Sequence, residues 1–169
     1  HDDGRMCATW CQAPAEEFVR ASIAAFDRGI VILHVLGGTS VELTGRRAIA
    51  QTKMTINQRA ALDGVMVDVA CSGRFYDFVE ERDGRWAIVL RQPIFDKDRL
   101  DPLVPGTPVP LDPTLLGRFP EEYRHLAYVQ TKAGFTVKTD MPLLRGPKVQ
   151  ALYAAGRAWL RGEPHGWAG

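Results

Sequence analysis

The chain has 169 residues, a length typical of one domain, which can bury a core without metals or disulfides. Apolar residues make up 46% and charged residues 24%, as in soluble globular proteins. The formal net charge of +1 excludes the basic footprint of a nucleic-acid or anionic-membrane binding protein. No apolar run approaches the roughly 20 residues that span a bilayer, and no signal-peptide pattern opens the sequence. We therefore expect no nucleic acid and no membrane among its partners.

The cysteines bear on the cellular compartment. Cys7, Cys11 and Cys71 are an odd set without a CxxC pair, which is typical of reduced thiols in a cytoplasmic protein. Residues 1–3, His-Asp-Asp, are adjacent and have no second cluster of ligands to complete a metal site. We therefore expect a cytoplasmic protein without a metal.

The first predicted element is a helix over residues 14–28. Pro14 suits the first helical turn, and Glu16 and Glu17 complement the positive N-terminal end of a helix. Gly29 is suited to end it.

Four long strands are predicted next. They span residues 30–43, 47–59, 65–80 and 85–95. Asp63-Gly64 and Asp83-Gly84 are hairpin turn signals, and Gly37-Gly38 inside the first strand predicts a bulge that bends it. A helix followed by long curled strands predicts an α+β fold, a cone-shaped curved mixed sheet or half-barrel covered by helices, with a pocket between sheet and helix.

The rest of the chain predicts an extension of this unit. Residues 101–113 hold five prolines and predict an extended linker. Two helices are expected behind it, over residues 120–132 and 146–161. We expect residues 1–100 to form the half-barrel, and residues 101–169 to be a linker and a helical extension that packs on it or contacts another subunit.

Two runs of residues carry a resemblance to a known family. They are Trp10 followed by APAEEFV at residues 13–19, and HVLGGTSVE at residues 34–42; a weaker signal is DGRW at residues 83–86. Over roughly residues 10–100 the chain resembles the scytalone dehydratase/SnoaL-like family of the nuclear transport factor 2-like superfamily. The resemblance implies the cone-shaped barrel, dimers or trimers, and no metal or organic cofactor. It also implies lyases or isomerases that act on small, hydrophobic, oxygenated molecules, with His34 as general base.

The sequence departs from the family pattern at several pocket positions. Aligning the pair Gln58-Arg59 places Asn57 where the dehydratase has a second histidine, and Phe75 where it has an asparagine. An asparagine binds oxygens but does not exchange a proton at neutral pH. The family's tyrosines and aspartate on its first helices have no counterpart. Either this sequence lacks those helices, as we expect, or the protein builds its pocket without them.

His34 stands in an otherwise apolar strand. An imidazole with a pKa near 6.5 accepts and returns a proton at neutral pH; the alternative is a core histidine bound to a backbone carbonyl. Strand alternation places Thr55 and Asn57 on one face, and the aligned histidine position indicates that this face lines the cavity. Lys53 and Arg59 share that face, and for them a solvated surface is the alternative.

The later strands supply the remaining candidates. Phe75 and Asp77 share a face. The Asp77 carboxylate either orients His34 or, as we favour, forms a surface ion pair with an arginine. Arg91 either binds an oxyanion of the substrate or closes an ion pair at the rim.

These residues predict a cofactor-independent lyase that acts on a small, hydrophobic, aromatic, oxygenated molecule. His34 is the expected base and Asn57 its companion, with Thr55, Phe75, Asp77 and Arg91 as substrate-binding residues. The reaction is either a dehydratase-like elimination or a cleavage that releases formaldehyde. The alternatives are a double-bond isomerase on the same scaffold and a non-catalytic binding or assembly module. We expect a homo-oligomer, a dimer or trimer.

Overall fold

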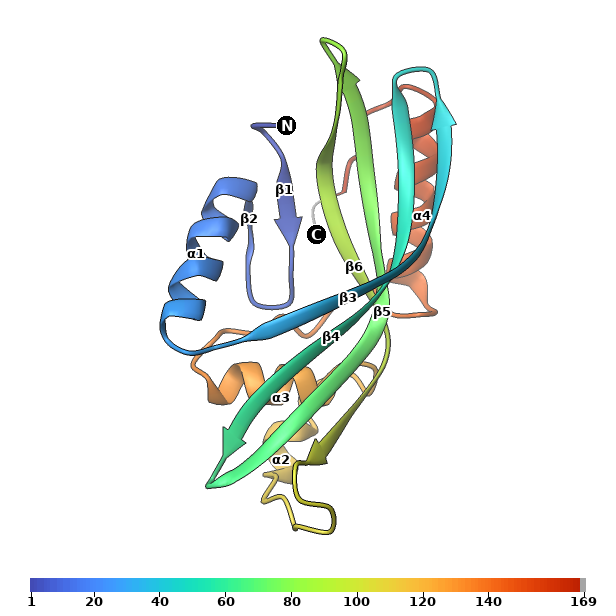
Figure 1. The fold of residues 1–169 in the computed structure, drawn as a ribbon. Coiled ribbons are helices and arrows are strands. Elements are labelled where there is room, and N and C mark those ends of the chain that lie inside the picture. Colours follow the sequence, from blue (N-terminus) through green and yellow to red (C-terminus); the bar gives the residue numbers. More distant parts are fainter. Residues whose placement is uncertain (168–169) are drawn as a thin grey trace.

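The computed structural model describes residues 1–167, and its main feature is a curved, twisted sheet (Figure 1). Its long strands are β3 (Ile32–Thr44), β4 (Arg47–Leu62), β5 (Val65–Arg82) and β6 (Arg85–Pro102), each antiparallel to the next. Both Asp-Gly pairs form the expected tight turns, because Asp63, Gly64, Asp83 and Gly84 all have the positive φ that such hairpins require.

Two details of the strands bear on the sequence analysis. The pairing of β3 with β4 shifts register between Leu36 and Thr39, so the bulge expected at Gly37-Gly38 is present. The last strand does not stop at residue 95 but continues to Pro102, because its second half pairs with the start of β5 as far as Val67.

A short hairpin was not predicted from the sequence. It consists of β1 (Arg5–Cys7) and β2 (Gln12–Pro14), and β1 pairs in parallel with β6. The strand order is therefore β2-β1-β6-β5-β4-β3, a mixed sheet that stays open at β2 and β3. Strands of three residues are too short to show a hydrophobic period, which is why the sequence did not reveal them.

Helices cover both faces of the sheet. They are α1 (Ala15–Asp27), α2 (Pro113–Leu116), α3 (Arg124–Lys132) and α4 (Pro147–Leu160). Within residues 1–167, none is long and apolar enough to cross a bilayer. In Figure 1, α1 and the β1–β2 hairpin lie beside the middle of the sheet, α3 lies below them, and α4 lies behind its upper half.

The two faces of the sheet carry separate cores. Phe75 and Phe95 pack with α3 on one face, in a cluster that includes Tyr123 and Leu126. On the other face Phe78 packs with α4, in a cluster that adds Leu90, Leu152 and Trp159. Gly156 allows α4 to lie close to this face, because a Cβ atom there would collide with the Tyr76 ring. Residues from the C-terminal third of the chain therefore complete both cores.

Candidate active site

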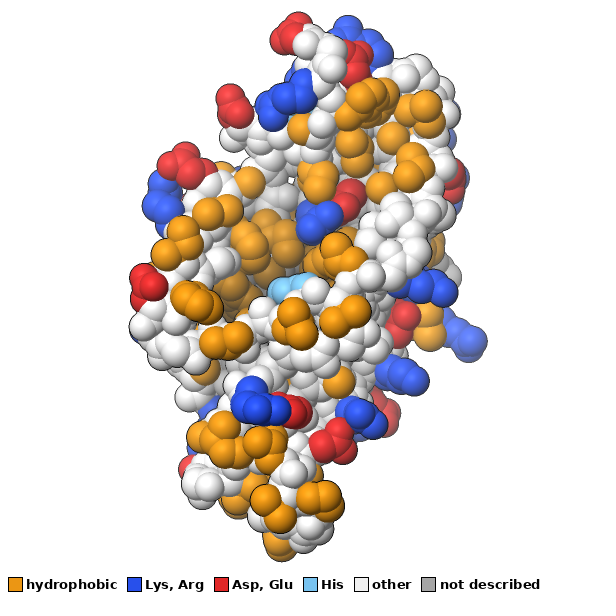
Figure 2. Space-filling model, in the orientation of Figure 1, with side chains coloured by type: hydrophobic (Ala, Val, Ile, Leu, Met, Phe, Trp, Pro, Cys, Tyr) orange, Lys and Arg blue, Asp and Glu red, His pale blue; other side chains and the backbone are white. Residues whose placement is uncertain are grey.

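Two adjoining hollows lie where the β1–β2 hairpin and α1 face the sheet. The outer one has a volume of about 510 Å³ and the inner one about 280 Å³. Met6, Phe18, His34 and Phe75 line both, so the two hollows lie side by side as an outer and an inner chamber. Figure 2 shows the hollow, lined by hydrophobic side chains, with a histidine at its edge. An apolar cavity with a few polar groups is the usual form of a small-molecule site.

His34 reaches this cavity from the edge strand β3. Its backbone pairs with Ile56, so its side chain shares the cavity face with Ile32 and Leu36. The imidazole stacks on Phe75, with ring centroids 6.2 Å apart and planes at 28°. His34 is exposed as a whole residue, but desolvation of its imidazole against the apolar wall and, secondarily, the charge of Arg91 lower the pKa of His34 below 6.5. The imidazole is therefore neutral at neutral pH and free to accept a proton.

Arg91 is held rigidly next to His34. Its Nε and Nη2 donate to the two carboxylate oxygens of Asp77 at 2.8 and 2.7 Å, and its guanidinium carbon lies 4.2 Å from the centre of the Phe75 ring. The Asp77 side chain is only 4% exposed and that of Arg91 30%. Among the residues described, Nη1 of Arg91 has no partner. Such a fixed guanidinium is suited to bind an oxyanion.

The structure places Phe75 and Arg91 next to His34, and Asp77 next to Arg91. Asp77 forms a hydrogen bond to Arg91 and not to His34 within the described part of the chain. The carboxylate therefore orients the arginine instead of the imidazole, and it does so as a buried pair and not as a surface one.

Thr55 and Asn57 do not join this cluster, and the prediction that they line the cavity is wrong. Because His34 pairs with Ile56, the residues on either side of Ile56 point to the opposite face. Thr55 Oγ1 lies there, 3.3 Å from Ser72 Oγ. The alternation was predicted correctly, but the apolar row of β4 faces the cavity and the polar row faces away.

The sequence did not indicate two further polar residues that line the cavity. Thr9 lies in the loop between β1 and β2, and Gln130 lies on α3; both are buried and line the inner chamber. Thr9 Oγ1 donates to Gln130 Oε1 at 2.7 Å. They are 121 positions apart, and no local pattern links residues at such a separation.

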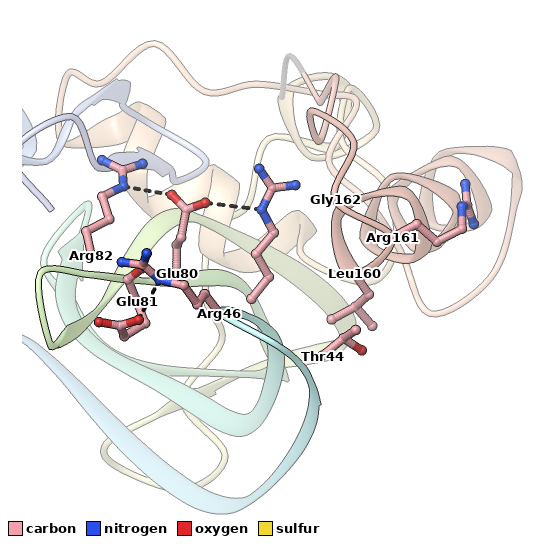
Figure 3. Close-up of a pocket in the computed structure, with 9 residues that line it drawn as sticks. Thr44, Arg46, Glu80, Glu81, Arg82, Leu160, Arg161 and Gly162 are labelled. Carbon is pink, nitrogen blue, oxygen red and sulfur yellow. Dashed lines mark hydrogen bonds and ion pairs between the residues drawn. The ribbon is translucent and has the colours of Figure 1, made fainter.

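A third hollow, of about 570 Å³, lies away from this cavity, between the β3–β4 and β5–β6 hairpins and the end of α4 (Figure 3). Its charges are largely paired: Glu80 accepts from Arg47 and Arg82, and Glu81 accepts from Arg46. Arg47 also donates to the carbonyl oxygens of Trp159 and Glu163. This cluster fastens α4 to the strands, and it offers neither a neutral base nor an apolar wall.

No three His, Cys, Asp or Glu side chains within residues 1–167 lie close enough together to hold a metal ion.

Comparisons with known proteins identify the family. The model of the SnoaL-like domain matches residues 2–92. A PEP2-like protein of Fusarium vanettenii is 34% identical over 174 residues, which cover 96% of this chain and 75% of that protein. Pea pathogenicity protein 2 of the same fungus is 33% identical over 174 residues with the same coverage.

Two solved structures superpose on part of this chain. A putative scytalone dehydratase from Novosphingobium aromaticivorans superposes with a TM-score of 0.47 at 14% identity, over 59% of this chain and 67% of that one. A single-residue variant of a Mycobacterium tuberculosis protein of unknown function superposes with a TM-score of 0.45 at 20% identity, over 83% of this chain and 77% of that one. From the match to the domain model and the identity to the fungal relatives, the chain belongs to the SnoaL-like domain family.

Proposed function

We propose that this protein is a cofactor-independent lyase that acts on a small, hydrophobic, aromatic, oxygenated molecule. One observation carries the proposal: the neutral imidazole of His34 faces an apolar cavity beside Arg91, a cation fixed by Asp77. A base and an oxyanion donor side by side are the minimum equipment for removing a proton next to a carbonyl.

In the elimination, His34 takes a proton from the carbon next to a carbonyl group, and the C–H electron pair moves onto the carbonyl oxygen. Arg91 stabilises the resulting enolate. When the carbonyl re-forms, the electron pair expels a hydroxide from the neighbouring carbon, and the proton on His34 goes to that hydroxide to give water. The imidazole is neutral again at the end of the cycle.

Release of formaldehyde uses the same two groups. His34 takes the hydroxyl proton of a hydroxymethyl group on a carbon next to a carbonyl. The C–O bond becomes a carbonyl as the C–C bond breaks, and the electron pair forms an enolate held by Arg91. His34 then returns its proton to the enolate carbon. Thr55 and Asn57 have no part in either scheme, because they face away from the cavity.

An isomerase is the second candidate. In that reaction His34 returns the proton to a different carbon of the enolate, while Arg91 holds the enolate oxygen. Product mass separates the two: an isomer has the mass of its substrate, whereas a lyase product has lost water or formaldehyde. A binding or assembly module would instead leave every compound unchanged.

The test is turnover of a panel of β-hydroxylated and hydroxymethylated aromatic ketones, followed by mass spectrometry of the products. We expect a product lighter than its substrate, and His34→Gln should lower the rate by about 10²–10⁴-fold. Ser72→Ala, on the opposite face, is the matched control and should keep the wild-type rate. Full activity in His34→Gln would overturn the base assignment.

A further inference from the structure

The inner chamber has the size and lining of a pocket for one substituted aromatic ring. Its volume is about 280 Å³, and a cavity of about 150 Å³ is known to accept benzene. Rings line much of its wall, those of Trp10, Phe18, Phe26, Phe75 and Phe95. Aromatic side chains bind a planar ring through stacked and edge-on contacts.

The side-chain amide of Gln130 lies in the wall of this chamber. Gln130 is 2% exposed, and its Oε1 accepts from Thr9 Oγ1. With Oε1 bound to Thr9, the Nε2 atom of the amide carries two N–H donors that this bond does not use. Nε2 has no hydrogen-bond partner within residues 1–167, although Gln130 lines the chamber. Nε2 is not closed off from solvent, so its N–H donors open onto the accessible space of the chamber, where a bound ligand can supply an acceptor.

We propose that Gln130 determines specificity. Its Nε2 donates to an acceptor oxygen, a carbonyl or an ether, on an aromatic ring bound in the inner chamber, and Thr9 positions the amide. The two chambers share His34 and Phe75, so a ligand held this way extends toward His34 and Arg91. This rests on the proposed function for the reaction at His34, but the binding itself does not require turnover. The substrate class is then an aromatic ring with one acceptor oxygen at the inner end and the reacting group at the outer end.

The experiment compares two probes of the same shape, acetophenone and α-methylstyrene, in which a CH₂ group replaces the carbonyl oxygen. Their dissociation constants are measured by NMR titration of the ¹⁵N-labelled protein. The Trp10 indole N–H reports binding in the inner chamber, and the Gln130 side-chain NH₂ signals report the hydrogen bond. We expect the wild type to bind acetophenone about 2–10-fold more tightly than α-methylstyrene, the range of one net hydrogen bond.

Three variants test whether the Nε2 donors of Gln130 cause the preference for acetophenone. Gln130→Met should bring the affinity ratio to about 1, and Thr9→Val should lower it by releasing the amide. Gln130→Glu keeps the shape and the acceptor for Thr9 but has no donor once its carboxyl is ionised, so it should also abolish the preference when the pH is well above the pKa of that carboxyl. It serves as the second variant if Gln130→Met fails to fold. A wild-type ratio of 1, or a ratio unchanged in both Gln130 variants, would overturn the proposal.

His34→Ala separates this proposal from the proposed function. His34→Ala removes part of the chamber wall and so changes both affinities, but their ratio should persist, because His34 takes no part in the hydrogen bond that distinguishes the two probes. If the ratio holds but no member of the substrate panel is turned over, the lyase proposal fails alone. If turnover depends on His34 but the ratio is 1, the assignment of Gln130 fails alone.

Discussion

At the residue scale, His34 depends on its neighbours to be a usable base. Its own strand is an exposed edge, so a low pKa has to come from the cavity side. There the apolar wall and the cation of Arg91 both disfavour the imidazolium form. Arg91 in turn stays in place because Asp77 accepts two of its hydrogen bonds. The chemistry of one side chain is thus set by three others on β5 and β6.

This arrangement predicts the pH dependence of His34. Because its pKa lies below 6.5, the neutral base should persist into mildly acidic solution, and activity should be lost only as pH falls through that lowered pKa. Arg91→Met removes the positive charge, so the pKa of His34 should rise and the acidic limb of kcat/KM should move to higher pH. NMR titration of the His34 Cε1–H signal measures both values.

The control for this titration is Arg59→Met, since Arg59 pairs with Asp68 at 2.8 Å on an exposed part of the sheet. The pKa of His34 should not change in that variant. If it rose by the same amount in both variants, the field of Arg91 would not be its cause.

The candidate site was predictable from the sequence only in part. Alternation along one strand grouped Phe75 with Asp77, because side chains two apart share a face whatever the rest of the fold does. Which face of β4 turns inward depends on the register with β3, which no local pattern contains. Asn57 was placed in the cavity because the family's second histidine aligns with it, and the register with β3 turns that face of β4 away. Thr9 and Gln130 were missed because they are 121 positions apart.

Asn57 gives a direct test of this correction. Asn57→Ala should change turnover less than about threefold, because the side chain lies behind the cavity wall, whereas truncation of a group in hydrogen-bond contact with the reacting atoms costs about 10²-fold or more. The rate on any substrate found in the panel measures it. A loss as large as that of His34→Gln would restore Asn57 to the site.

At the element scale, α3 is held in place by a residue outside it. Its N-cap residue, Tyr123, makes no side-chain capping bond. Instead Asp98 of β6, whose side chain is fully buried, accepts from the backbone N–H groups of His125 at 2.6 Å and Leu126 at 2.9 Å. Its other oxygen lies 2.8 Å from Nδ1 of His125. A strand aspartate thus caps the helix that carries Gln130.

We therefore expect Asp98→Ala to lower the free energy of unfolding by about 2 kcal/mol, since it removes charged acceptors from buried N–H donors. Urea denaturation followed by circular dichroism measures the change. Asp101→Ala is the matched control, because Asp101 pairs with Arg99 on the surface, where ion pairs contribute about 0–1 kcal/mol. Equal losses in the two variants would contradict the capping role of Asp98.

The cap that Asp98 provides for α3 shows why the sequence did not predict where this helix begins. The long strands and the helix at residues 146–161 were found because their patterns repeat over many residues. The first turn of the helix expected at 120–132 is not helical, and α3 begins only at Arg124, where Asp98 caps it. A cap supplied from another strand leaves no local signal.

At the scale of the whole molecule, an apolar surface remains uncovered along β3. Leu33, Val35 and Leu43 are each more than half exposed, and β3 forms one open edge of the sheet. An edge strand with apolar side chains is a ready partner for another strand. The curved sheet was predictable from its turns and long strands, but not which face each C-terminal helix covers, because that choice depends on contacts across the sheet.

We expect a second copy of the chain to cover this edge, with β3 pairing antiparallel to its own copy about a two-fold axis. An edge strand is complementary to itself in that geometry, and a closed symmetric pair is the commonest oligomer. The pairing would also cover the outer side of the strand that carries His34.

Light scattering coupled to gel filtration tests this association. We expect twice the chain mass of 18.7 kDa for the wild type, and a monomer for the double variant Leu33→Lys, Val35→Lys, because two lysines per strand place four charges at the paired edges. Val104→Lys is the matched control: Val104 is 68% exposed but lies in the loop after β6, so it should leave the mass unchanged. A wild type that runs as a monomer at tens of micromolar would refute the pairing, and so would a double variant that keeps the full mass. If the lysine pair gives a monomer that still turns over substrate, the cavity of one chain suffices for catalysis, and the edge serves assembly alone.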